Sequence, residues 1–175
     1  MAIIKEIRGF KPVIGNDCFI AETAAVIGDV TMGDNCSIWY GTVLRGDVNS
    51  ILIGNNVNIQ DGAVVHTLFQ RSKTIIGDNV SIGHNATIHG ATIKSNSLVG
   101  MGATVLDNAV VESGAIVAAN ALVTAGMRVE SGWIYAGVPA KKIKEVSPEQ
   151  QKEIVERIAN DYIMYSSWYK NEDER

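Results

Sequence analysis

The chain contains little cysteine, proline or aromatic residue, and it carries no strong charge of either sign. Its 175 residues include 2 cysteines and 3 prolines, and 6% are aromatic. We interpret Cys18 and Cys36 as small buried residues of a reduced protein, although their spacing would permit a disulfide. The net charge of −4 provides no electrostatic basis for binding nucleic acid or an anionic membrane, so we expect neither partner.

The chain also lacks a long apolar run. Residues 1–6 become charged too early for a secretory signal peptide, and no segment approaches the length of a transmembrane helix. We therefore expect a cytoplasmic protein. A length of 175 residues corresponds to a single domain.

A repeat of six residues dominates the sequence instead. Its period matches neither the α-helix, at about 3.6 residues, nor the alternation of a simple strand. It predicts an all-β solenoid in which each unit supplies a short strand and a turn, and three units make a triangular coil of about eighteen residues. The recurring aliphatic residues, expected to point inwards, are Ile14, Ile20, Val26, Met32, Ile38, Leu44, Ile53, Ile59, Val65, Ile76, Ile82, Ile88, Ile93, Val99, Val105, Val111, Val117, Val123 and Val129.

Three departures from this period predict where the coils are interrupted. The aliphatic spacing is nine residues over 44–53, eleven over 65–76 and five over 88–93. We therefore expect inserted loops after Asp47 and after His66.

The three histidines of the chain all fall within residues 66–89. When the units are assigned to three faces in turn, Arg45, His66 and His89 hold the same position on successive coils. The Cβ atoms of His66 and His89 should then lie about 4.8 Å apart, as on neighbouring strands, so both imidazoles can bind one metal ion. The alternative is that each histidine is only a solvated or hydrogen-bonded side chain. The shared position of His66 and His89 on successive coils favours metal binding.

His84 belongs to the preceding face, beneath Asp61, and is badly placed to reach the other two histidines of its own subunit. In a threefold trimer of parallel solenoids, a neighbour's His84 can face that pair. Three neutral imidazoles that leave a fourth position open form a zinc site of the catalytic type.

The sequence resembles the γ-class carbonic anhydrase family of hexapeptide-repeat proteins over about residues 10–170. The stretches that carry the resemblance are Trp39-Tyr40-Gly41, Leu44-Arg45-Gly46-Asp47, Asn58-Ile59-Gln60-Asp61-Gly62, His66, Ile82-Gly83-His84, His89-Gly90 and Gly137-Val138-Pro139-Ala140-Lys141. The resemblance implies a left-handed parallel β-helix and a homotrimer. It implies zinc, or alternatively iron or cobalt, bound by His66 and His89 of one subunit and His84 of the next. The implied activity is the reversible hydration of carbon dioxide to bicarbonate by a metal-bound hydroxide.

The same resemblance suggests roles for four polar residues near the histidines. Arg45 and Asp47 would form an intersubunit ion pair beside the metal, where the guanidinium suits a bicarbonate. Asn58 and Gln60 would orient the hydroxide and the substrate. An ordinary salt bridge and solvated corner residues are the alternatives.

Asp61 and Tyr162 complete the set of candidate site residues. Asp61 is placed either to accept a hydrogen bond from His84, which would fix the tautomer of that imidazole, or to pair with Arg45. Tyr162 resembles a tyrosine that some members of the family bring near the metal, and a packing aromatic residue is the alternative.

One departure from the family concerns proton transfer. The best-studied members carry a glutamate just after the Arg-x-Asp sequence and another in an acidic loop after the first histidine. Here those places hold Val48 and the loop 67–74, which contains no acidic residue. Because general acid and base groups contribute about 10²–10⁴ in rate, we expect metal binding with slow turnover.

Two other classes of function stay open. The stretch 137–141 also occurs in hexapeptide acyltransferases, which suits an acyl-CoA acyltransferase or a thioesterase. A non-catalytic trimeric metal-binding scaffold is the further alternative. Two histidines in register form a good metal clamp and a poor single base, which favours the anhydrase.

The single domain, 1–175, is expected to have four parts. These are an N-terminal strand or cap over 1–11, the solenoid over 12–134, a connector over 135–146 and a helix over 147–170. Ser147 as N-cap, Pro148 at the first helical position and Gln150 at the third predict where the helix begins.

Overall fold

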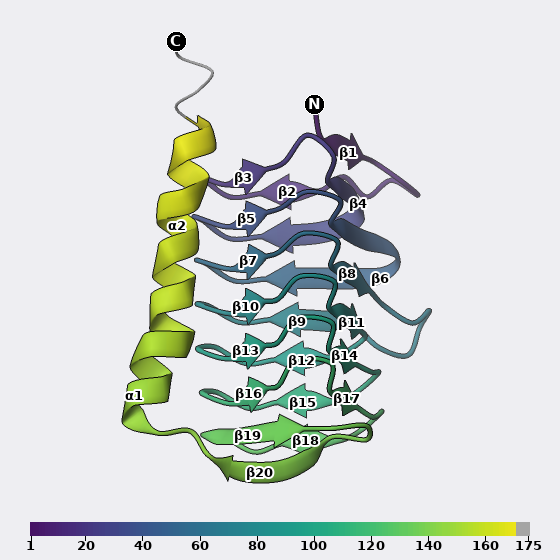
Figure 1. Ribbon diagram of the computed structural model, residues 1–175. Helices are drawn as coiled ribbons and strands as arrows, with labels where there is room; N and C mark the ends of the chain where they lie inside the picture. Colours follow the sequence, from purple (N-terminus) through teal and green to yellow (C-terminus); the bar gives the residue numbers. More distant parts are fainter. Residues whose placement is uncertain (171–175) are drawn as a thin grey trace.

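The strands stack into a β-solenoid whose coils have three faces (Figure 1). The structure is a computed structural model that describes residues 1–170. The first face comprises the beginnings of β4 (Ala25–Met32) and β6 (Val43–Ile53), then β8 (Val64–His66), β11 (Thr87–His89), β14 (Thr104–Val105) and β17 (Leu122–Val123). The second comprises β2 (Val13–Ile14), the ends of β4 and β6, β9 (Thr74–Ile76), β12 (Thr92–Ile93), β15 (Val110–Val111) and β18 (Arg128–Val129). The third comprises β3 (Phe19–Ile20), β5 (Ser37–Ile38), β7 (Asn58–Ile59), β10 (Ser81–Ile82), β13 (Leu98–Val99), β16 (Ile116–Val117) and β19 (Trp133–Ala136).

The two ends of the solenoid are closed by further strands. At the N-terminal end, β1 (Ile3–Lys5) pairs in parallel with β4. At the other end, β20 (Lys141–Glu145) pairs antiparallel with β19. The segment 135–146, expected as a connector, therefore contains the end of β19 and all of β20.

The predicted inward positions form the core. From Val26 to Val129, every aliphatic residue of the repeat is at most 6% exposed, and only the first two positions, at the N-terminal end, are partly buried. Equivalent residues stack directly, as in the register of Ile59 with Ile82 and of Ile82 with Val99. Removing these apolar surfaces from water is the main force that stacks coil on coil.

The two predicted loops differ in structure. Residues 67–73 form a loop between β8 and β9, as expected. The insertion after Asp47 was expected to be a loop as well, but β6 runs through it and pairs with β4 across a register shift between Gly28 and Val30. An irregular strand accommodates the extra residues because it keeps its hydrogen bonds to β4 on either side of the shift.

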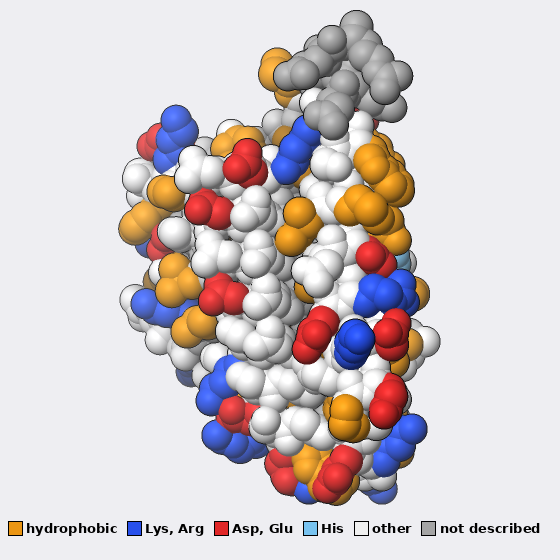
Figure 2. All heavy atoms as spheres, turned by 90° about the vertical axis from the view of Figure 1, so that its left-hand side faces the viewer, with side chains coloured by type: hydrophobic (Ala, Val, Ile, Leu, Met, Phe, Trp, Pro, Cys, Tyr) orange, Lys and Arg blue, Asp and Glu red, His pale blue; other side chains and the backbone are white. Residues whose placement is uncertain are grey.

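A helix lies along the third face (Figure 1). It consists of α1 (Pro148–Gln150), the π-helical η1 (Gln151–Glu156) and α2 (Arg157–Lys170). The predicted capping box is present, because Ser147 Oγ accepts from Gln150 N and Gln150 Oε1 accepts from Ser147 N, both at 3.2 Å. Figure 2 shows apolar side chains gathered near the upper, C-terminal end of this helix and acidic and basic ones mixed over its lower part. Within residues 1–170, the structure contains no helix both long and apolar enough to cross a membrane.

Candidate metal centre

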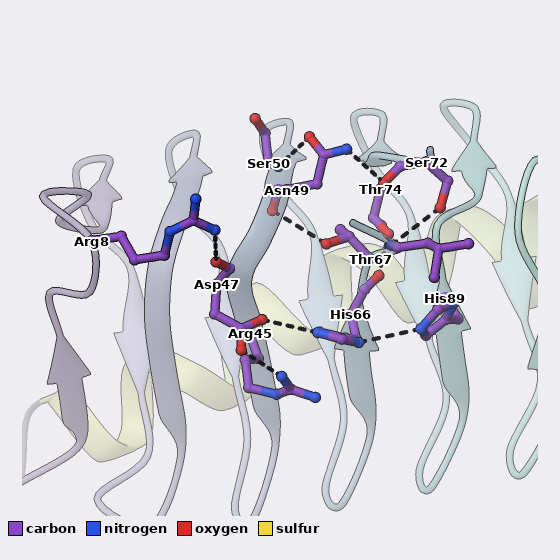
Figure 3. Close-up of polar contacts among 11 residues, drawn as sticks. Arg8, Arg45, Asp47, Asn49, Ser50, His66, Thr67, Ser72, Thr74 and His89 are labelled. Carbon is purple, nitrogen blue, oxygen red and sulfur yellow. Dashed lines mark hydrogen bonds and ion pairs between the residues drawn. The ribbon is translucent and has the colours of Figure 1, made fainter. Parts of the chain in front are cut away.

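Two histidines meet at the ends of neighbouring strands. His66 ends β8 and His89 ends β11, and the two are direct partners in the parallel pairing of these strands. Their rings point toward each other, with His66 Nδ1 at 3.2 Å from His89 Nε2 (Figure 3). The predicted coil register of the two histidines is confirmed.

Each ring is held on its other nitrogen by a carboxylate. His66 Nε2 lies 3.0 Å from Asp47 Oδ1, and His89 Nδ1 lies 2.9 Å from Asp107 Oδ2. An ionised carboxylate only accepts hydrogen bonds, so each imidazole donates its outer N–H. In the neutral form of each ring, the nitrogen that faces the other ring then presents a lone pair.

Facing lone pairs fit a bound cation. They repel each other unless a positive charge lies between them, whereas two nitrogens at about 2.0–2.1 Å from one tetrahedral ion are about 3.4 Å apart. The observed 3.2 Å is close to that separation. The pair is thus arranged as two ligands of a zinc-type ion that would need further ligands from elsewhere.

Asp47 joins His66 to a basic group. Its Oδ2 lies 2.6 Å from Arg45 Nη1, and Arg8 Nη1 donates to its main-chain oxygen at 3.1 Å (Figure 3). Burial raises the pKa of Asp47, but hydrogen bonds from His66 and Arg45 outweigh it and hold the pKa below its usual range. The predicted ion pair of Arg45 and Asp47 forms within one chain, and its contact with a second subunit stays a prediction.

His84 also lies beside a carboxylate, on a different face. It follows β10 on the third face, and its Nδ1 lies 2.9 Å from Asp61 Oδ2, so Asp61 is the neighbour that the sequence predicts for it. Its other nitrogen, Nε2, lies 3.5 Å from Tyr162 Oη. Among residues 1–170, no three or more histidine, cysteine or acidic side chains of one chain are grouped to hold a metal. The structure therefore brings His66 and His89 together and leaves His84 apart from them.

Tyr162 packs as an aromatic residue and also lies beside His84, while its place near a metal stays a prediction. Its ring packs edge-on against Trp39 with centroids 5.3 Å apart, while its hydroxyl is the neighbour of His84. Burial raises the pKa of Tyr162 to about 12, so the phenol is neutral at physiological pH.

Asn58 and Gln60 lie on the third face with His84 and not on the face of the His66–His89 pair. Asn58 Nδ2 donates to Ser81 Oγ at 2.7 Å, and Gln60 Nε2 donates to Asn58 Oδ1 at 3.0 Å. Both side chains are buried. Their hydrogen bonds stabilise the wall of the solenoid, and their role in orienting the hydroxide and the substrate stays a prediction.

Comparison with known proteins places the chain in a family. Models of the bacterial transferase hexapeptide (six repeats) and of the hexapeptide repeat of succinyl-transferase match residues 11–46 and 73–107. Gamma carbonic anhydrase 2, a mitochondrial protein of Arabidopsis thaliana, is 44% identical over 170 residues, which are 94% of this chain but only 61% of the plant protein. A carbonic anhydrase of Geobacillus kaustophilus is 38% identical over 163 residues, 93% of this chain and 88% of the relative. The chain belongs to the γ carbonic anhydrase-like family of hexapeptide-repeat proteins.

A solved structure agrees with this membership. The γ carbonic anhydrase-like chain matches the crystal structure of a hexapeptide transferase family protein from Anaplasma phagocytophilum with a TM-score of 0.91 and 44% identity. The match covers 95% of this chain and 98% of the other.

Two residues beside the histidines of this γ carbonic anhydrase-like chain were not predicted from the sequence. Asp107 holds His89, and Ser72 Oγ donates to Asp107 Oδ1 at 2.5 Å. Burial raises the pKa of Asp107, but hydrogen bonds from Ser72 and His89 outweigh it, so the pKa lies below its usual range. The eighteen residues from His89 to Asp107 are one coil, and that spacing is the signal that could have indicated the contact.

Proposed function

We propose that the chain forms a homotrimer that binds one zinc ion, or alternatively iron or cobalt, at each subunit interface and hydrates carbon dioxide to bicarbonate. His66 and His89 of one subunit and His84 of the next would hold the ion. The observation that supports this most directly is the pair of facing imidazole nitrogens 3.2 Å apart, each ring with a carboxylate on its other nitrogen. His84, whose Nδ1 lies 2.9 Å from Asp61 Oδ2, would be the third ligand through Nε2.

The ion would supply hydroxide at neutral pH, because it lowers the pKa of a bound water from 15.7 to about 7. The chain supplies the rest. Asp47, Asp61 and Asp107 each hold one imidazole in the tautomer that can bind. The guanidinium of Arg45, 43% exposed beside Asp47, suits the two oxygens of a bicarbonate.

Proton release is the step for which the proposed site has the fewest suitable groups. Val48 and the loop 67–74 offer no carboxylic acid. Tyr162, with a pKa of about 12, can donate a hydrogen bond but cannot serve as a base near neutral pH. We therefore expect turnover about 10²–10⁴ below that of a member with an acidic shuttle, and a rate that rises with the concentration of an external buffer.

The deciding experiment measures metal content and carbon dioxide hydration on the same samples. Protein purified without a histidine tag is compared with His84→Ala, with metal measured by mass spectrometry and hydration by stopped flow. We expect about one metal per chain in the wild type, and loss of hydration in the variant. No metal in the wild type under any reconstitution would end the proposal.

An acyl-group activity is the second candidate, because the matching family models and the related crystal structure carry transferase names. Bound metal without hydration, together with cleavage of acyl-CoA thioesters, would favour a thioesterase, and acyl transfer from the same thioesters to an amine or hydroxyl would favour an acyltransferase. Bound metal with none of these activities would favour a non-catalytic scaffold.

A further inference from the structure

We propose that Asp107 and Ser72 form a positioning unit for His89, and that the loop 67–73 serves to deliver Ser72 to it. The inference rests on the proposed metal site. It assigns a function to a loop that has no acidic residue to offer for proton transfer.

Asp107 controls both the tautomer and the angle of the His89 ring. His89 Nδ1 lies 3.0 Å from Asp107 Oδ1 and 2.9 Å from Asp107 Oδ2. With its N–H donated between these two oxygens, the ring has only Nε2 left as a lone pair, and Nε2 is the atom that faces His66. A carboxylate behind a ligating histidine also makes that imidazole more basic and a stronger ligand.

Ser72 fixes the carboxylate in turn. Its hydroxyl accepts from Leu68 N at 3.2 Å, so the hydroxyl proton is directed to Asp107 Oδ1, 2.5 Å away. The residue is buried, and its main-chain oxygen accepts from Asn49 Nδ2 at 3.0 Å (Figure 3). The loop is thus fastened to the coil above by Asn49 and to the second coil below by Asp107.

Gly90 leaves the space that this arrangement needs. Its φ is +58°, and a Cβ built on it would lie 1.9 Å from Ser72 Oγ and 2.3 Å from Asp107 Oδ1. Any side chain at position 90 would therefore push Ser72 and Asp107 away from His89. Position 90, directly after His89, is therefore glycine because Ser72 and Asp107 occupy the space that a side chain would need.

The first residue after the loop, Thr74 of β9, holds His66. Thr74 Oγ1 donates to the main-chain oxygen of His66 at 2.7 Å and accepts from Gly90 N at 3.1 Å. Thr74 therefore ties the two histidine-bearing strands together near the point where the rings meet.

The first test is metal affinity, measured by competition of apo protein with a chromophoric chelator for zinc or cobalt. Asp107→Ala should weaken binding 10- to 100-fold. Asp107→Asn should lose less metal affinity because its amide oxygen still accepts from His89. Ser72→Ala should also lose less affinity than Asp107→Ala. Asp78→Ala and Ser131→Ala are matched controls. The Asp78 carboxylate accepts hydrogen bonds from Asn55, and the Ser131 hydroxyl donates to the main-chain oxygen of Ser113. Both variants should bind the metal as tightly as the wild type does.

The second test needs no metal and so separates this inference from the proposed function. Imidazole ¹⁵N shifts of the metal-free wild type should show His89 protonated at Nδ1, and this tautomer should lose its preference in Asp107→Ala. Thermal unfolding by circular dichroism confirms that each variant folds. If Asp107→Ala fails to fold, the wild-type tautomer and the affinity of Ser72→Ala decide.

Two results would overturn the inference: His89 protonated at Nε2 in the wild type, or wild-type affinity in both folded Asp107→Ala and Ser72→Ala. A wild type with the Nδ1–H tautomer that binds no metal would end the proposed function and support the positioning of His89.

Discussion

At the scale of single residues, the two cysteines should differ sharply in reactivity. The neighbouring Cys36 side chain lowers the pKa of Cys18 to about 7. The neighbouring Cys18 side chain and burial both raise the pKa of Cys36, which is almost fully buried. Because the thiolate is the nucleophile, iodoacetamide should modify Cys18 at a rate that rises through pH 7 and then levels, while Cys36 stays unmodified in the folded protein. Peptide mass spectrometry across pH measures both rates.

Replacing Cys36 tests the cause of this difference. Cys36→Ala removes the neighbouring thiol and should move the midpoint of the Cys18 rate profile upwards by about one pH unit or more. Cys36→Ser keeps a polar group at this position and should move the midpoint less. An unchanged midpoint in the alanine variant would show that the Cys36 thiol does not set the reactivity of Cys18.

Residue positions were predictable from the sequence where counting along the coil determines them. The pairing of His66 with His89 follows from the six-residue period once the five residues inserted between Val65 and Ile76 are discounted, and the closeness of His84 to Asp61 follows from the same count. Ser72 was not predictable, because its place depends on the path of a loop that has no period. Arg45 and Asp47 were expected beside the metal, but counting could not show that Asp47 binds His66 directly.

At the scale of elements, stacked asparagines stabilise one corner of the solenoid. Asn79 has a φ of +55°; its Oδ1 accepts from Asn56 Nδ2 at 3.0 Å and its Nδ2 donates to Asn96 Oδ1 at 3.1 Å. Asn79→Ala loses both hydrogen bonds, worth about 1 kcal/mol each, and replaces an asparagine, which tolerates the left-handed region, by an alanine, which does not, at a further cost of about 1 kcal/mol. We expect the free energy of unfolding in urea to fall by about 3 kcal/mol.

Asn79→Gly separates the two contributions. It loses the same hydrogen bonds but tolerates the positive φ, so it should be about 1 kcal/mol more stable than the alanine variant. Equal stabilities of the two variants would mean that backbone strain at this corner contributes nothing.

Element boundaries were predictable where local chemistry specifies them. The helix begins where Ser147, Pro148 and Gln150 indicate, because capping depends on adjacent residues only. Neither the π-helical turn over residues 151–156 nor the passage of β6 through the predicted loop could be foreseen. Both depend on what the segment packs against, which the hexapeptide pattern does not specify.

At the scale of the whole molecule, exposed apolar side chains lie on or beside the face that carries His66 and His89. They are Val64, Leu68 and Phe69. Scattered exposed apolar residues are ordinary, but exposed apolar residues beside the proposed metal site suit an interface. In the proposed trimer, a second chain would both cover these residues and bring its His84.

Mixing two inactive variants would test whether the site is shared. His84→Ala lacks the ligand offered to a neighbour, and His66→Ala lacks part of the pair that receives it. In a trimer assembled from equal amounts of both, an interface is intact only when the pair comes from the first variant and His84 from the second. Each condition is met half of the time, so about a quarter of the wild-type sites should return. Co-refolded mixtures should then bind about a quarter of the wild-type metal, whereas each variant alone binds little. If the three histidines acted within one chain, or if the chain did not trimerise, mixing would restore nothing, because every chain would still lack one of its own ligands.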